Sequence, residues 1–216
     1  MTAAEVGWIG AEVEAEFPGL GLVHLAASVV GRDDIREAAA AAKARLEHLE
    51  AYFSGAVVRE LPARPLTGAY RVFFRQIGLD PDTQLTPIER IARERLGVGR
   101  FRSRGLLQDT LKVAALETEV PVLALRAAEV LGPLGITTSR DGERLGGVEL
   151  PPSTLVIADA ARPLAILFGG EDDPAPHAAD HLDPELMLYA PIVPGVSPAI
   201  AGEALWLAAQ MLGPLD

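Results

Sequence analysis

The order of hydrophobic and polar residues along the chain predicts a strand and then a long helix within its first sixty residues. An apolar run with a β-branched end, Gly21 to Val30, has the length of a buried strand. Either Asp33 or Asp34 can act as the N-cap of an alanine-rich helix, which we expect to end near Phe53.

Three further helices are predicted after a connector that contains two prolines. They cover residues 68–77, 86–97 and 106–117. The first should end at Gly78, which stands where a left-handed C-cap belongs. The second has the strongest local signal, because Thr86 and Glu89 have the spacing of a capping box and Pro87 occupies the first helical position.

Beyond these helices, short β-type runs separated by Gly, Pro and Asp predict a series of strands. The strands are expected at residues 120–125, 136–139, 154–158, 164–168 and 186–193. A short helical turn is expected at 127–131, and an apolar helix at 197–212. Because helices gather early and strands late, the predicted class is α+β rather than alternating α/β.

The 216 residues contain no polar low-complexity linker, so we expect a single domain over residues 1–216. Within it, residues 1–60 form the N-terminal strand and long helix, and residues 61–216 form the core. The lack of cysteine excludes disulfides and cysteine-ligated zinc. The acidic start is unlike a signal peptide and no apolar run approaches a membrane span, so we expect a cytoplasmic protein without a membrane partner.

The net charge of −11 argues against strong general nucleic-acid binding, including DNA binding. Charge is unevenly spread, however, because residues 90–104 hold six arginines against the single acid Glu94. Arg100, Arg102 and Arg104 alternate between glycines and are candidates for contacting the phosphates of an RNA. The alternative is a run of surface arginines paired with the abundant glutamates.

Two separate segments carry a resemblance to a known family. The segment Ser153 to Glu171 (STLVIADAARPLAILFGGE) resembles a strand, turn and strand of the B3/B4 editing domain of the phenylalanyl-tRNA synthetase β subunit. The segment ending at Pro121 (LLQDTLKVAALETEVP) resembles that family's "VDxTNYVxLExGxP" helix. Residues 69–96 are similar to the region that precedes this domain in free-standing members, so the resemblance runs from about Ala69 to Leu212.

This resemblance implies a Greek-key β-barrel-like core flanked by helices, on which the synthetase hydrolyses tyrosine wrongly attached to its tRNA. Gly169 and Gly170 match the family's glycine pair, whose backbone N–H groups can approach a ligand closely, although the pair can also simply form a turn. Asp109 matches an aspartate that can cap a helix, orient a loop or contact substrate. Glu171 is a candidate general base, with a surface role as the alternative.

Several positions depart from the family's pattern. Lys112 replaces an asparagine, and Leu123 replaces a histidine and can neither donate nor accept a hydrogen bond. The glutamate that recognises the tyrosine hydroxyl falls near Tyr189 or, with another gap, Glu185. These departures indicate either a pocket reshaped for a different amino acid or a pocket filled by side chains.

No metal or cofactor is expected. His177 and His181 are four residues apart among acids, but Pro174 and Pro176 favour irregular chain and a solvated acidic loop.

Two hypotheses follow. The first is a deacylase that binds aminoacyl-tRNA weakly and hydrolyses the ester, and the second is a non-catalytic module that binds an amino-acid-like ligand, RNA or a protein partner. A solvent-accessible cavity at Gly169, Lys112 and Leu123 is what the first hypothesis requires.

Overall fold

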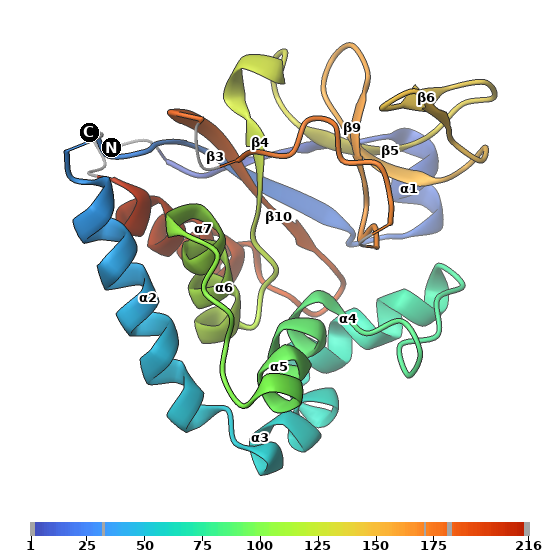
Figure 1. The fold of residues 1–216 in the computed structure, drawn as a ribbon. Coiled ribbons are helices and arrows are strands. Elements are labelled where there is room, and N and C mark those ends of the chain that lie inside the picture. The colour runs from blue at the N-terminus through green and yellow to red at the C-terminus, as the bar shows by residue number, and fades with distance from the viewer. Residues whose placement is uncertain (1–2, 32, 171, 181–182, 214–216) are drawn as a thin grey trace.

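Two four-stranded sheets and a stack of helices make up the structure (Figure 1). It is a computed structural model that describes residues 3–31, 33–170, 172–180 and 183–213. The predicted α+β class is confirmed. No helix in the described part of the chain is long and apolar enough to cross a membrane.

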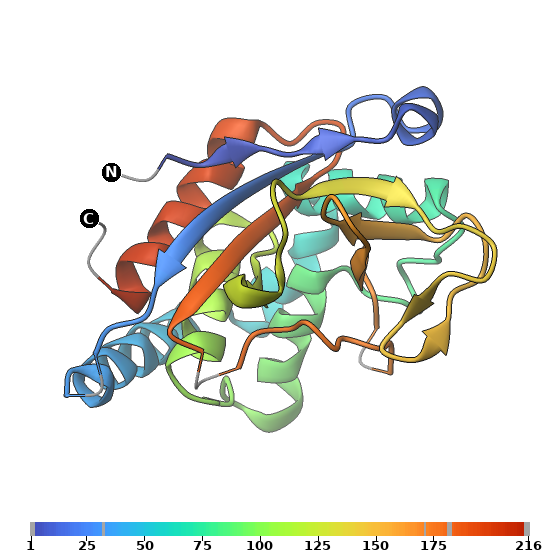
Figure 2. The ribbon, with the colours of Figure 1, turned by 90° about the horizontal axis from the view of Figure 1, so that it is seen from above.

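The first sheet is antiparallel throughout and joins the two ends of the chain. Its strand order is β1 (Glu5–Val6), β3 (Gly21–Ser28), β10 (Glu185–Ile192) and β4 (Leu123–Arg126). β3 and β10 pair along all eight residues and run side by side across the molecule (Figure 2). The early strand is therefore internal to the main sheet.

The second sheet is mixed, since its first pair is parallel. Its order is β2 (Trp8–Ile9), β5 (Gly135–Thr138), β8 (Leu155–Ala158) and β9 (Pro163–Ile166). A separate hairpin joins β6 (Arg144–Leu145) to β7 (Val148–Glu149). Neither sheet closes on itself among the described strands, so the expected barrel is not shown.

Three helices stack beneath the first sheet (Figure 1). They are α7 (Pro198–Leu212), α6 (Leu106–Thr118) and α2 (Ile35–Tyr52). α7 packs on β3 and β10, α6 packs on α7, and α2 packs on α6. Four alanines of α7 are buried and allow its backbone to approach the strands closely: Ala201, Ala204, Ala208 and Ala209.

The remaining helices lie outside this stack, one against the second sheet and three at the far end of the stack. They are α1 (Ala11–Glu16), α3 (Gly55–Glu60), α4 (Pro65–Gln76) and α5 (Pro87–Val98), with 3-10 turns at Leu61–Ala63 and Ala127–Glu129. The capping box predicted at Thr86 is present, and Gly78 has the left-handed φ of +81° predicted for it. Residue Pro65 begins α4 instead of lying in a connector, because a proline at the first helical position loses no hydrogen bond.

A buried ion pair fixes α4 against α5. Arg71 is 8% exposed, and its Nη1 donates to Oε1 of Glu89 at 2.6 Å. The other oxygen of Glu89 completes the capping box by accepting from the N–H and hydroxyl of Thr86. Arg71 also pairs with the exposed carboxylate of Asp82. The position of α5, and of the loop after it, therefore depends on this network.

Candidate functional site

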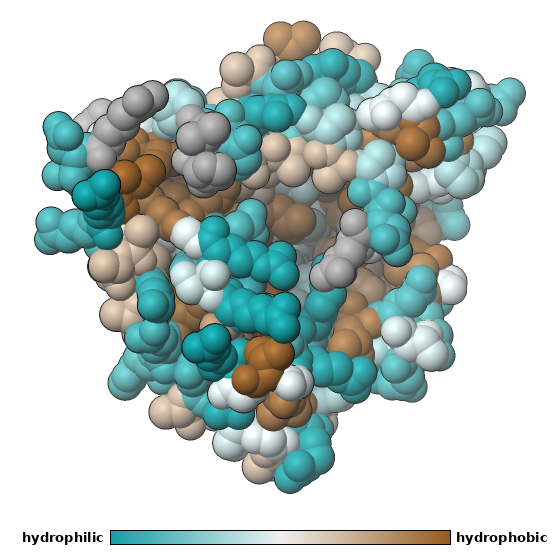
Figure 3. Space-filling view, in the orientation of Figure 1, coloured by the Kyte–Doolittle hydropathy of each residue, from teal (hydrophilic) through white to brown (hydrophobic). Residues whose placement is uncertain are grey.

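A cavity of about 780 Å³ opens between helices α5 and α6 on one side and strands β4, β9 and β10 on the other. Figure 3 shows a hollow near the middle of this face, where hydrophilic residues adjoin hydrophobic ones. Its volume lies within the range typical of small-molecule sites. The predicted residues that line it are Arg102, Arg104, Lys112, Leu123, Gly169, Gly170 and Tyr189.

Two of the predicted residues that the structure describes do not line this cavity. Arg100 is exposed and lies outside the lining, and Asp109 is fully buried and also outside it. Glu171 lies outside the described residues. The cavity nonetheless contains the combination of Gly169, Lys112 and Leu123 that the sequence singled out, and these residues leave it open rather than filled.

Asp109 orients the loop that carries the arginines. It lies in the first turn of α6, where its Oδ1 accepts from the backbone N–H of Arg104 at 2.8 Å. Its Oδ2 accepts from the hydroxyl of Ser103 at 2.5 Å. Both carboxylate oxygens are thus used within the protein, so of the three roles left open by the sequence, the structure shows loop orientation.

Lys112 is held in an ion pair that the sequence did not reveal. Its Nζ lies 2.8 Å from Oε2 of Glu94 on α5 and 3.0 Å from the carbonyl oxygen of Arg102. The two side chains are 11% and 22% exposed. The pair ties α5, α6 and the arginine loop together at the wall of the cavity, and the charge of Lys112 is neutralised there.

The two glycines form a closed turn after β9. The N–H of Gly169 donates to the carbonyl of Ile166 at 3.2 Å, and the N–H of Gly170 donates to Oδ2 of Asp173 at 2.6 Å. A Cβ on Gly169 would lie 3.2 Å from that same Oδ2, which explains why a glycine fits there. Both N–H groups are therefore engaged inside the protein rather than directed to a ligand.

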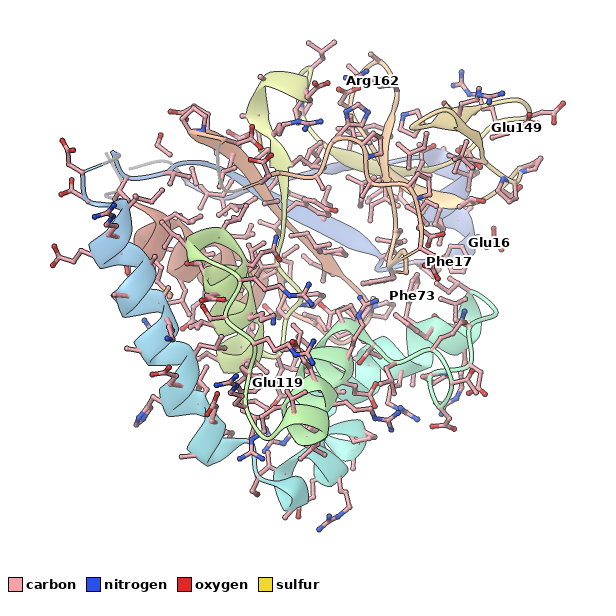
Figure 4. The ribbon with its side chains drawn as sticks, in the orientation of Figure 1. Glu16, Phe17, Phe73, Glu119, Glu149 and Arg162 are labelled. Carbon is pink, nitrogen blue, oxygen red and sulfur yellow. The ribbon has the colours of Figure 1, made fainter. Side chains whose placement is uncertain are left out.

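Phe168 anchors this turn in a left-handed conformation. Its φ is +57°, which is unusual for a residue with a side chain, and its ring contacts Tyr70, Phe73 and Phe74 on α4 at centroid distances of 5.2 to 6.0 Å. Phe73 in turn contacts Phe17, and Figure 4 shows these two side chains next to each other. The backbone N–H of Phe168 has no hydrogen-bond partner among the described residues.

Tyr189 supplies a hydroxyl to an otherwise apolar wall. On the first sheet it lies opposite Leu123 of β4 and His24 of β3, so the three side chains share one face. Burial raises the pKa of Tyr189, so its phenol is neutral and can donate, and no described residue pairs with its hydroxyl. Burial likewise lowers the pKa of His24, which is 4% exposed.

The mouth of the cavity carries three cationic side chains without carboxylate partners. Arg90, Arg102 and Arg104 line it, and none forms an ion pair with a described residue. Arg90 was not singled out by the sequence, because it comes from α5 whereas the others come from the following loop. Among the residues that the structure describes, pairing of these arginines with glutamates, the alternative explanation for the arginine run, is thus not observed.

Of the two histidines considered for a metal, His177 is described and does not line this cavity. His177 lies with its Nδ1 3.3 Å from Oε2 of Glu129, and His181 lies outside the described residues. Within the described ranges, no group of three or more His, Asp or Glu side chains is arranged to hold a metal ion.

Comparison with known proteins supports the resemblance over about half of the chain. The chain is 34% identical over 119 residues to the phenylalanine–tRNA ligase beta subunit of Chromobacterium violaceum, covering 52% of the chain and 14% of that protein. It is 34% identical over 121 residues to the same subunit of Xanthomonas euvesicatoria pv. vesicatoria, covering 53% and 15%. No protein-family model matches the chain. The chain thus spans about a seventh of the length of these curated relatives and contains a region related to them.

Proposed function

We propose that this chain is a free-standing, cytoplasmic aminoacyl-tRNA deacylase related to the B3/B4 editing domain. Water adds its oxygen to the carbonyl carbon of the ester, the bond from that carbon to the ribose oxygen breaks, and the products are the free amino acid and a tRNA with a free terminal hydroxyl. The observation that carries the proposal is the open 780 Å³ cavity whose mouth holds unpaired arginines. The similarity to the ligase subunit supports the same substrate class.

The cavity offers different surroundings to the two parts of such a substrate. Its inner wall is built largely from apolar side chains of β4 and β9, among them Leu123, Leu125 and Leu164, and these suit an amino-acid side chain. Arg90, Arg102 and Arg104 at the mouth suit the phosphates of the acceptor end. Binding through three such contacts is weak, as the net charge of −11 requires.

Ester hydrolysis also requires donors for the negative charge that develops on the carbonyl oxygen. The glycine N–H groups are engaged, so two other donors take this role in our proposal: the hydroxyl of Tyr189 and the N–H of Phe168. Both residues line the cavity. Neither group has to give up an existing hydrogen bond in order to bind an oxyanion.

The proposal is tested by incubating the pure protein with a panel of mischarged tRNAs and measuring the amino acid released. We expect release from at least one of them. The double variant Arg102→Glu and Arg104→Glu should raise KM, because phosphate contacts are lost. The matched control is Arg59→Glu with Arg75→Glu, since both are exposed arginines outside the cavity and the charge change is the same.

No release from any tRNA at high protein concentration would contradict the proposal. Equal KM increases in the two double variants would contradict the role of the cavity arginines, because they would indicate an effect of net charge alone.

The second candidate is a non-catalytic module that binds an amino-acid-like ligand, RNA or a protein partner. It is favoured by the engagement of both glycine N–H groups within their own turn. A thermal-shift screen with free amino acids and short RNAs separates the two candidates, because a bound ligand stabilises the native protein whether or not it is hydrolysed. Stabilisation without release in the tRNA panel supports the second candidate.

A further inference from the structure

The acidic side chains of the cavity differ in whether a cation neutralises them, although each has one oxygen without a hydrogen-bond partner among the described residues. Two described residues place a carboxylate in its lining, Glu94 and Asp173. Glu94 is neutralised by Lys112 at 2.8 Å. Asp173 forms no ion pair among the described residues, and only its Oδ2 is used, as the acceptor for the N–H of Gly170. Its side chain is exposed, and its Oδ1 is available to a ligand.

From this arrangement we propose that Asp173 binds the free α-ammonium group of the substrate, so that the protein acts on aminoacyl esters and discriminates against N-blocked ones. This inference rests on the proposed function, and it names the substrate class more narrowly. An ammonium group donates hydrogen bonds and carries a positive charge, and both features match the free carboxylate oxygen of Asp173. The other unpaired charges of the cavity are all cations, and these repel an ammonium group: Arg90, Arg102 and Arg104.

The placement of charges also orients the substrate. Asp173 follows the turn after β9, whereas the unpaired arginines come from α5 and the loop before α6. A substrate with an ammonium group at one end and phosphates at the other therefore fits with its amino acid toward β9 and its RNA toward the helices. An acyl group on the nitrogen removes the charge and adds bulk beside Asp173.

The contact of Asp173 with this turn also explains why glycines occupy positions 169 and 170. Oδ2 of Asp173 lies where a Cβ on Gly169 would come within 3.2 Å, and it accepts from the N–H of Gly170. The turn therefore positions a carboxylate at the cavity, rather than offering N–H groups to an oxyanion.

The test compares Asp173→Asn with Asp172→Asn, which removes an equal charge from the exposed neighbour outside the cavity lining. Asparagine keeps an acceptor for the N–H of Gly170, so the turn should be retained, and circular dichroism with thermal unfolding checks this. The substrates are one mischarged tRNA and the same tRNA after N-acetylation. We expect the wild-type protein and Asp172→Asn to prefer the free amine, and Asp173→Asn to lose roughly tenfold to a hundredfold of that preference in kcat/KM.

A second measurement does not depend on hydrolysis. Amino acid amides and their N-acetyl counterparts are titrated against each variant and followed by thermal shift. Binding of the free amides that is weakened by Asp173→Asn and unaffected by Asp172→Asn supports the inference even if no tRNA is deacylated. If deacylation occurs but the two variants discriminate alike, or if the wild-type protein accepts N-acetylated substrates equally well, the inference is overturned and the proposed function stands.

Discussion

Replacing Lys112 by methionine should destabilise the protein, because the carboxylate of Glu94 then remains partly buried without its cation. The Lys112 side chain is 11% exposed, and its Nζ makes a charged hydrogen bond of 2.8 Å to Glu94 and a second bond to a carbonyl. A hydrogen bond to a charged group is worth about 1.5 to 3 kcal/mol, and an ordinary one about 1 kcal/mol. We therefore expect the free energy of unfolding to fall by roughly 2 to 4 kcal/mol.

A double-mutant cycle with Glu94→Gln isolates the interaction. Because the glutamine has no charge to leave unpaired, the double variant should lose less than the sum of the single losses, with a coupling energy of about 1 to 2 kcal/mol. Urea unfolding followed by circular dichroism measures all four proteins. The control cycle is Lys43→Met with Glu47→Gln, an exposed pair at 3.7 Å whose coupling should stay below about 0.5 kcal/mol. Equal coupling in the two cycles would refute the reasoning.

The remaining predictions concern buried groups elsewhere in the fold. Arg71→Met leaves the carboxylate of Glu89 buried without its cation, and should cost about 3 to 5 kcal/mol in urea unfolding; a loss below about 1 kcal/mol would contradict this. Gly135→Ala places a Cβ 2.1 Å from the indole of the neighbouring strand and should lower stability by about 3 kcal/mol or more, whereas Gly31→Ala, with open space around it, should have little effect. The pKa of His24 is below its ordinary value of 6.5 in the folded protein, so its imidazole binds a proton more readily in the unfolded chain. The contribution of neutral His24 to the free energy of unfolding should therefore be fully present above pH 6.5 and be lost as the pH falls through the lowered pKa. His24→Leu should flatten that decline in a pH series of unfolding curves. An unchanged slope would show that other groups cause the decline.

Local sequence signals located most elements, because they act over a few residues. The capping box at Thr86, the proline after it and the glycine at position 78 each determine backbone geometry where they stand. Sequence patterns missed the strands β1, β2, β6 and β7 and the helices α1 and α3, since strands of two residues are too short for periodicity and a six-residue helix shows barely two turns of pattern. Contacts with other segments of the chain stabilise such short elements, as when β2 pairs with the distant β5.

The sequence predicted which residues line the candidate site better than it predicted what those residues do there. The resemblance brought Lys112, Leu123 and Gly169 together, and all three line one cavity. What the residues do there depends on neighbours from other elements. Only the folded chain shows that Glu94 neutralises Lys112 and that Asp173 occupies the N–H of Gly170, because sequence spacing carries no information on contacts between α5 and α6 or on how a loop turns back.

The pairing of β3 with β10 bears on how the chain is made. Ser28 and Glu185 are hydrogen-bonded to each other although 157 positions separate them. A ribosome adds on the order of 5 to 20 residues per second, so the early strand waits roughly ten seconds or longer with its polar backbone uncovered before its neighbour emerges. Such distant pairing slows acquisition of the native state, and the apolar segment at residues 21–28 is where protection by a chaperone during synthesis would matter most.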